Sequence, residues 1–272
     1  MKSSIDPVLD VQEIMDVMVK IKYLKKGFLT NFYPDLDQVS LWIQEKLLWK
    51  REFLNTVFFL KSNDSFNYLY YISSGYECLS ADLDSLLAHE HEAIVAEIVT
   101  QKENDDVLTL FKTKLFFTYA ILVRLSMKTP DVASTDFPEQ VRLAKSVDLH
   151  YVEDKLKSAF DRYSERLPHQ KELDHFIQSG CVLLYEDQGG IRGFILYEVD
   201  GVTQHLRYWF VDPDFRNKKV GSSLFNAYLV CGNTTKRQIL WCRTDNENAM
   251  KRYEHYGYKR EIMYDHIIQW KS

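Results

Sequence analysis

The sequence has few cysteines, and they form no pattern that binds a metal or builds a disulfide framework. None of the four belongs to a Cys-x-x-Cys pair or to a Cys/His ligand spacing: Cys78, Cys181, Cys231 and Cys242. Scattered cysteines of this kind are typical of buried, reduced thiols in a cytoplasmic protein. We therefore expect a cytoplasmic protein without a metal site.

Long apolar runs and an excess of positive charge are also missing. No stretch approaches the ~18 uninterrupted apolar residues of a membrane helix, and no apolar run follows Lys2, so the sequence predicts neither a membrane span nor a signal peptide. The formal net charge is -5, which argues against a nucleic-acid partner because such binding usually needs a basic face. The 46% of hydrophobic residues are enough for a full globular core.

A polar segment near the middle divides the chain. Residues 128–138 (KTPDVASTDFP) are rich in Pro, Ser, Thr and Asp, a composition typical of a linker. We therefore expect an α/β domain over residues 1–130 and a second domain over residues 138–272.

Hydrophobic periodicity predicts both helices and strands in each half. The first half has the pattern of two helices and two strands, followed by helix, strand, helix and strand. In the second half, a short strand at residues 140–143 precedes two helices, three strands, a helix, a strand, a helix and a β-rich tail. This order predicts a mixed α/β sheet with helices on both faces.

The most informative stretch is VDPDFRNKKVGSSLF, residues 211–225. A strand ending at Val211 is followed by Pro213, a basic turn and the apolar-periodic start of a helix. Backbone N–H groups from Arg216 to Ser222 would point into one concavity at the N-terminus of that helix, where the helix dipole favours an anion such as pyrophosphate. The alternative is a solvated basic turn that caps a helix.

A second stretch, DNENAMKRYEHYGYK at residues 245–259, adds a second motif. The second half resembles the GCN5-related N-acetyltransferases, the GNAT superfamily, whose cofactor loop has the form Arg/Gln-x-x-Gly-x-Gly/Ala. Here the loop runs from Arg216 to Ser222, and Lys219 replaces the first glycine. The family's later pattern, Asn-x-x-Ala-x-x-x-Tyr-x-x-x-Gly-Phe/Tyr, is matched by Asn246, Ala249, Tyr253, Gly257 and Tyr258.

The resemblance implies a mostly antiparallel sheet, acetyl-CoA as cosubstrate and direct attack by an amine in a ternary complex. The loop would hold the CoA pyrophosphate, the strand before it would bond the pantetheine arm, and an N–H near Phe210 would polarise the thioester carbonyl. Asn246 would contact the pantetheine or the end of its own strand. The residues expected to bind the cofactor are Phe210, Val211, Arg216, Asn217, Lys218, Lys219, Val220, Gly221, Ser222 and Asn246.

Two residues are candidates for proton transfer. The resemblance places Tyr253 as the acid that protonates the departing CoA thiolate; the alternative, in a chain with 17 tyrosines, is a core aromatic. His205 lies on the strand before the cofactor loop, where several members carry a base, and its ordinary pKa suits that role. The alternatives for His205 are a half-buried strand histidine or a base supplied by water. The loop at residues 161–171 either contacts an anionic acceptor or is solvated.

The first half lacks a cofactor loop, but its order of elements echoes that of the second. At a fixed offset, 253 - 111 = 142, Phe111 falls on Tyr253 and Asn104 on Asn246. We expect a degenerate copy of the same fold without a cofactor; the alternative is an unrelated α/β domain that shapes the acceptor cleft. The expected function is an acyltransferase, an N-acetyltransferase for a small molecule or peptide, acting as a monomer with tandem domains or as a homodimer. The alternative is a non-catalytic CoA-binding regulatory or scaffolding protein.

Overall fold

The computed structural model describes residues 5–271 except residues 25, 34, 102–104 and 132–135. The chain forms two compact units: unit 1 is Met1–Leu122 with Met263–Ser272, and unit 2 is Val123–Ile262. These units differ from the expected domains 1–130 and 138–272. The boundaries fall inside two strands because the chain's last strand completes the core of unit 1, where Ile268 is buried. Of the expected linker, residues 132–135 lie outside the described residues.

Unit 1 contains four helices among its described residues and a sheet in the order β1-β3-β4-β5-β6-β13, with β2 beside β5. Its elements are β1 (Asp6–Pro7), α1 (Val11–Tyr23), β2 (Leu29–Thr30), α2 (Leu36–Gln44), β3 (Leu48–Glu52), β4 (Thr56–Asn63), β5 (Phe66–Ser73), α3 (Tyr76–Leu87), β6 (Ala93–Thr100), α4 (Asp106–Thr113), the first part of β7 (Phe117–Lys128) and the last part of β13 (Lys259–Trp270). Helices α1, α2 and α4 each begin after an aspartate whose carboxylate accepts backbone N–H groups, as expected of a helix N-cap.

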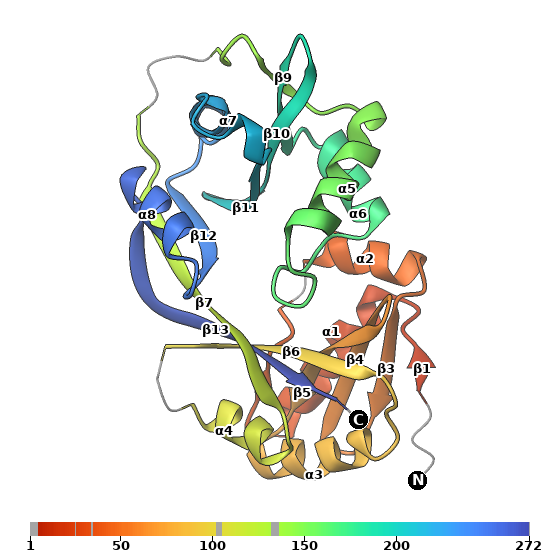
Figure 1. Cartoon of the computed structure of the whole chain (residues 1–272). Coiled ribbons are helices and arrows are strands. Elements are labelled where there is room, and N and C mark those ends of the chain that lie inside the picture. The colour runs from red at the N-terminus through yellow and green to blue at the C-terminus, as the bar shows by residue number, and fades with distance from the viewer. Residues whose placement is uncertain (1–4, 25, 34, 102–104, 132–135, 272) are drawn as a thin grey trace. The chain divides into compact units, whose positions relative to one another are not determined.

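Helices cover both faces of the unit 1 sheet (Figure 1). Side chains of α3 and α4 form one core with alternate residues of β4, β5 and β6, including the fully buried Phe111. On the other face, Phe32 packs against Phe59 and Tyr70, and Trp42 of α2 stacks on Tyr70. The two-residue alternation of each strand therefore supplies two separate apolar layers.

Unit 2 repeats this plan, with strands in the order β13-β7-β12-β11-β10-β9-β8. Its elements, besides the remaining parts of β7 and β13, are β8 (Val141–Leu143), η1 (Ser146–Asp148), α5 (Leu149–Ala159), α6 (Gln170–Gln178), β9 (Val182–Asp187), β10 (Gly190–Asp200), β11 (Thr203–Val211), η2 (Pro213–Phe215), α7 (Val220–Cys231), β12 (Arg237–Arg243) and α8 (Glu247–His255). The expected mixed, mostly antiparallel sheet with helices on both faces is confirmed.

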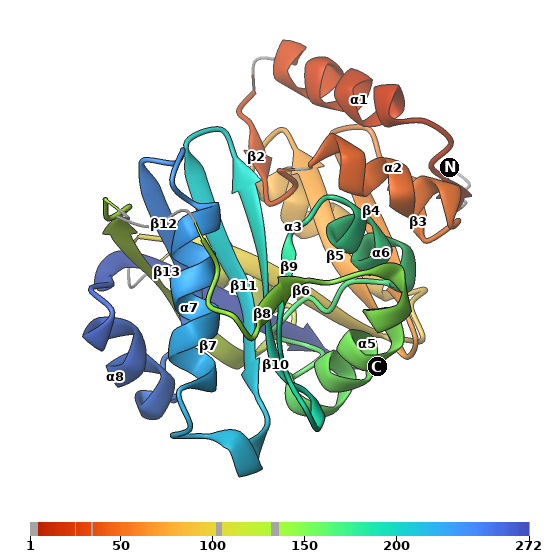
Figure 2. The ribbon, with the colours of Figure 1, turned by 90° about the horizontal axis from the view of Figure 1, so that it is seen from above.

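The two faces of the unit 2 sheet carry different helices. Helices α5 and α6 pack on one face, in a core that includes Phe194, Tyr208 and Phe210. On the other face, α7 lies along β11 (Figure 2), and Phe225 of α7 contacts Trp209 of β11 and Tyr256, the residue after α8. The residues of β11 therefore alternate between the α5–α6 face and the α7–α8 face.

Among the strand pairings of the described residues, each unit has a parallel pair. These pairs are β5 with β6 and β11 with β12. Within the described residues, no helix is long and apolar enough to cross a membrane. All four cysteines are free, and only Cys242 is buried, whereas the other three are partly exposed.

Candidate functional site

Strands β11 and β12 diverge halfway along their length. They pair only where Thr203–Leu206 faces Arg237–Leu240. On its other side, β11 remains paired with β10 as far as Val211. One edge of residues 207–211 is therefore not paired with β12, and an unpaired strand edge offers N–H and C=O groups to an extended ligand.

A β-bulge lies at the start of this divergence. Leu196 of β10 faces Tyr208, but the next residue, Tyr197, faces Leu206, so Arg207 is the additional residue on β11. A bulge of this kind bends its strand and increases the local twist. Neither glycine nor proline marks this position, which is why the sequence pattern did not predict it.

The pairing with β10 decides which N–H groups face the open edge. The N–H of Asp212 donates to the carbonyl of Arg192 at 2.9 Å. Because every second residue of a strand bonds to the same neighbour, Phe210 is directed toward β10, whereas Trp209 and Val211 are directed toward the open edge. The Phe210 ring is also buried, stacked on Phe194. The expected N–H near Phe210 is therefore not that of Phe210 itself, since Trp209 and Val211 present theirs at the open edge.

The loop after β11 ends in an uncapped helix N-terminus. The backbone of Asn217 and Lys219 is left-handed, with φ of 63° and 65°, and no side chain caps α7. The first helical bond runs from the N–H of Ser223 to the carbonyl of Lys219, at 2.9 Å. The N–H groups of the three residues between them therefore lack an intrahelical acceptor, and a helix N-terminus in this state favours an anion.

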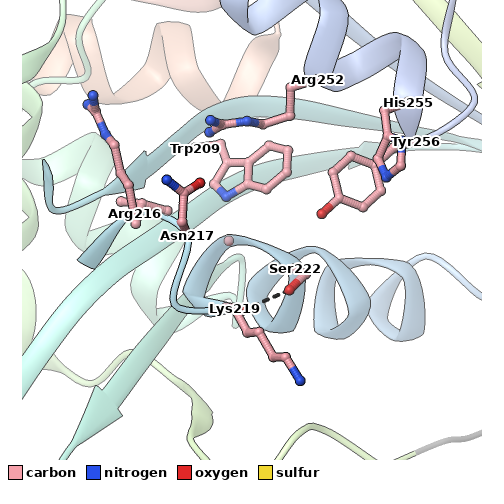
Figure 3. A pocket seen from close by; sticks show the side chains of 10 residues that line it. Trp209, Arg216, Asn217, Lys219, Ser222, Arg252, His255 and Tyr256 are labelled. Atoms are coloured by element: carbon pink, nitrogen blue, oxygen red, sulfur yellow. Dashed lines mark hydrogen bonds between the residues drawn. The ribbon is translucent and has the colours of Figure 1, made fainter. Parts of the chain in front are cut away.

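These groups open into a cavity of about 330 Å³ (Figure 3). The cavity is lined by Trp209, Val211, Arg216, Asn217, Lys219, Gly221, Ser222, Arg252, His255 and Tyr256. The loop supplies two cations and α8 supplies a third, Arg252, while none of the lining residues is acidic. The cavity therefore combines free backbone donors with positive charge, which suits a phosphate-bearing ligand.

Six of the ten residues expected to bind a cofactor line this cavity: Val211, Arg216, Asn217, Lys219, Gly221 and Ser222. The other four lie elsewhere. Phe210 is in the core, and Val220, the first residue of α7, is on the buried face of that helix. The Lys218 ammonium lies over the ring of Phe215, 4.6 Å from its centroid, and Asn246 caps α8 by accepting the N–H of Ala249 at 3.1 Å.

Sequence reasoning missed four residues of the cavity: Trp209, Arg252, His255 and Tyr256. Three of them carry a usable signal, because positions 252, 255 and 256 recur at the spacing of one helical face. Trp209 has no such signal, since the strand pattern alone does not show which face borders the loop.

Tyr253 lies on α8 beside the cavity. Its ring contacts Trp209 and Tyr258, with centroids 6.1 Å apart in both cases. Its hydroxyl has no hydrogen-bond partner among the described residues. Burial, and then the neighbouring Cys242 and Glu165, raise the pKa of this phenol. Tyr253 is therefore a neutral hydroxyl at physiological pH, with a proton to donate.

His205 lies on β11 just before the bulge. Its Nδ1 is 3.8 Å from Oε2 of Glu198, and Glu198 also accepts a hydrogen bond from Arg207 at 2.6 Å. Burial lowers the pKa of His205 well below its ordinary value, and the positive charges of Arg207, Arg124 and Arg166 lower it further. The imidazole is therefore neutral at pH 7 and is a weak base.

The loop at residues 161–171 is held against β11. The hydroxyl of Tyr208 donates to the carbonyls of Glu165 and Arg166, at 2.6 and 2.8 Å. Asp161 accepts the N–H groups of Tyr163 and Ser164 and closes a turn. These contacts place the loop close to His205 and Tyr253, whose pKa values it influences.

Unit 1 has the same divergence of parallel strands, but its own chain fills the opening. Strands β5 and β6 pair only at residues 66–68 and 93–95. Beyond them, the Asn31 carboxamide accepts the N–H of Tyr71 at 2.8 Å and donates to the carbonyls of Leu69 and Glu97 at 3.0 and 3.3 Å. Strand β2 also pairs with the end of β5. The opening that would admit a ligand is therefore closed.

The offset between the halves also fits the structure. Phe111 and Phe116 form an edge-on ring pair in unit 1, and Tyr253 and Tyr258 form one in unit 2. Asn104, the expected counterpart of Asn246, lies outside the described residues.

Comparison with known proteins identifies the fold. Residues 178–260 match the family model described as the acetyltransferase (GNAT) domain, and no curated protein sequence matches the chain. A tandem GNAT protein from the clavulanic acid biosynthesis pathway, solved without acetyl-CoA, has a TM-score of 0.62 and 8% identity over 98% of each chain. A GNAT-family acetyltransferase from Colwellia psychrerythraea has a TM-score of 0.56 and 12% identity, again over 98% of each chain.

A GCN5-related N-acetyltransferase from Sphaerobacter thermophilus has a TM-score of 0.57 and 12% identity, covering 88% of this chain and 82% of its own. Identities this low show the fold alone. The family model, in contrast, spans β9 to the start of β13, including the diverging strands, the uncapped α7 and the Tyr253 helix. Residues 178–260 therefore match a GNAT acetyltransferase domain, within a chain whose fold is that of a tandem GNAT protein.

Proposed function

We propose that unit 2 binds acetyl-CoA and transfers its acetyl group to a primary amine of a small molecule or peptide. The observation that carries this proposal is the uncapped N-terminus of α7, which opens into a cavity with Arg216, Lys219 and Arg252 in its wall and no acidic side chain. A pyrophosphate carries the charge and the acceptors that such a cavity lacks.

The open edge of β11 supplies the second half of the binding site. The pantetheine arm carries amide groups, and residues 207–211 offer strand N–H and C=O groups that β12 does not use. An extended amide chain bonding to this edge would add one strand to the sheet at the point where it divides. The thioester would then lie near the bulge at Arg207 and near the helix that carries Tyr253.

In the transfer step, the amine nitrogen forms a bond to the thioester carbonyl carbon and the bond from that carbon to sulfur breaks. A strand N–H near the bulge at Arg207 would donate to the carbonyl oxygen as negative charge develops on it, while the N–H groups of Trp209 and Val211 would bond the pantetheine arm nearer the loop. Tyr253 would give its phenolic proton to the departing sulfur, and the proton of the attacking nitrogen would pass to His205 or to water. No cysteine lines the cavity among the described residues, so direct transfer is the simplest route.

One observation favours the alternative, a protein that binds CoA without turnover. The pKa of Tyr253 is raised and the pKa of His205 is lowered, so the acid and the base both shift in the direction that weakens proton transfer. A regulatory or scaffolding protein would need the cavity but neither shifted group.

Isothermal titration with acetyl-CoA, followed by a thiol-release assay on a panel of amines, separates these functions. Binding with release of CoA supports the transferase; binding without release for any amine supports the alternative; absence of binding rejects both. The variant Gly221→Asp places a carboxylate in the cavity, where even a β-carbon would lie 3.3 Å from the Trp209 ring, and binding should be lost. Gly201→Asp is the control, because a β-carbon at that turn meets nothing within 4 Å and aspartate is among the residues that adopt its left-handed φ of 53°.

A further inference from the structure

The indole N–H of Trp209 is a buried donor without an acceptor. Its Nε1 atom is shielded from solvent and has no hydrogen-bond partner among the described residues. Such orphaned donors are rare because each loses its hydrogen bond to water without replacement. A phenylalanine would fill most of the same apolar space without leaving an unpaired donor, so the presence of Trp209 needs an explanation.

The surrounding rings hold the indole in place. Trp209 is stacked on Phe225 with the centroids 5.3 Å apart and an interplanar angle of 20°. Tyr253 and Tyr256 contact it at 6.1 and 5.6 Å. Phe225 belongs to α7, Tyr253 to α8, and Tyr256 directly follows α8. Packed against all three rings, the indole cannot turn to find an acceptor elsewhere without disturbing this packing.

The indole nitrogen lies beside the first turn of α7. A β-carbon built on Gly221 would be 3.7 Å from Nε1 and 3.3 Å from the adjoining ring carbon Cζ2. The free N–H groups of this turn and the indole N–H therefore border the same cavity. In Figure 3 the nitrogen edge of the ring is turned toward the side of the cavity where Asn217 lies.

We propose that Trp209 is a binding residue whose indole N–H donates to an oxygen of the acetyl-CoA pyrophosphate on the first turn of α7. The inference rests on the proposed function. It assigns to Trp209 a side-chain donor in addition to its backbone N–H at the open edge. A hydrogen bond to a charged acceptor is stronger than one to a neutral group, so a phosphate oxygen at this position would offset the cost of burying the indole N–H without an acceptor.

The direct test is an NMR spectrum of the indole N–H groups, with CoA and acetyl-CoA as ligands. The chain has five tryptophans, and Trp209→Phe identifies the Trp209 signal by its loss. On ligand addition this signal should move downfield, while that of Trp42, the other buried and unpartnered indole, should stay in place. If Trp209→Phe does not fold, substitution of the other four tryptophans assigns the signal in proteins that keep Trp209.

Affinity provides the second measurement. Trp209→Phe should weaken acetyl-CoA binding about tenfold, the loss expected for one hydrogen bond to a charged group. Trp42→Phe is the matched control: it removes an equally orphaned N–H from a residue of unit 1 that does not line the cavity, and should leave affinity unchanged. Wild-type binding with an unmoved Trp209 signal and equal affinity in Trp209→Phe would overturn this inference and leave the proposed function standing. Absence of wild-type binding would reject the function itself.

Discussion

Lys219 is held in a backbone conformation that suits glycine. Its φ of 65° and ψ of 0° are left-handed, which costs a residue with a β-carbon about 1–2 kcal/mol. Lys219→Gly removes this cost but gives the unfolded chain more freedom, worth about 0.4–1 kcal/mol in the opposite direction. The lysine ammonium has no ion-pair partner among the described residues, so no lost ion pair adds to these two effects. The net change in stability is therefore their difference. The free energy of unfolding should rise by about 0.5–1 kcal/mol.

The same change should weaken acetyl-CoA binding only slightly. The variant keeps the backbone N–H at position 219 and loses one exposed cation, and an exposed ion pair is worth about 0.2–1 kcal/mol. The dissociation constant should therefore rise by less than about fivefold. Urea denaturation measures the first effect and isothermal titration the second.

Leu115→Gly is the matched control for the backbone argument. Leu115 has the same φ of 65° and an 81% exposed side chain, and it belongs to unit 1 and does not line the cavity. Both variants should gain stability, and only Lys219→Gly should change affinity. If Leu115→Gly is stabilised and Lys219→Gly is destabilised, the lysine side chain holds the loop and the strain argument fails. A loss of affinity beyond about tenfold would show that binding needs the ammonium itself.

Three further changes test other parts of the structure. Tyr253→Phe should lower the rate of thiol release with little change in acetyl-CoA affinity or stability, because its hydroxyl is unpartnered among the described residues; an unchanged rate rules it out as the acid. Between pH 7 and pH 5, His205→Gln should lose less stability than the wild-type protein in urea denaturation. The pKa of His205 is depressed in the folded protein, so below about pH 6.5 the proton binds the unfolded chain first and destabilises the wild-type fold. Equal losses would contradict the shift. Asn31→Ala leaves three backbone groups without their carboxamide partner and should cost about 3 kcal/mol, yet titration should still find one acetyl-CoA per chain; a second site would show that Asn31 alone closes unit 1.

The sequence predicted local features well. Helical periodicity and the spacing from Asn246 to Gly257 both depend on residues close together in the chain, and the structure places α7 and α8 where these patterns put them. Arg216 and Gly221 were predicted from the motif and do line the cavity.

Features that depend on distant contacts were not predictable. The direction of the Phe210 N–H follows from the pairing of β11 with β10, and no local pattern reports that register. The three hydrogen bonds of Asn31 reach residues 38 to 66 positions away. The replacement of the family's first loop glycine by Lys219 can be read from the sequence, but the left-handed φ that strains its backbone cannot.

The place of β13 has a consequence for synthesis of the protein on the ribosome. Tyr264–Trp270 pairs with β6, and Ile268 lies in the core that α3 and α4 cover, so unit 1 lacks an internal strand until these residues exist. All 140 residues of unit 2, Val123–Ile262, are made in between, which takes on the order of ten seconds at about 5–20 residues per second. Unit 1 is thus translated first but finishes folding last. During that interval the edge of β6 that β13 later covers is unpaired, and an unpaired strand edge is prone to aggregation.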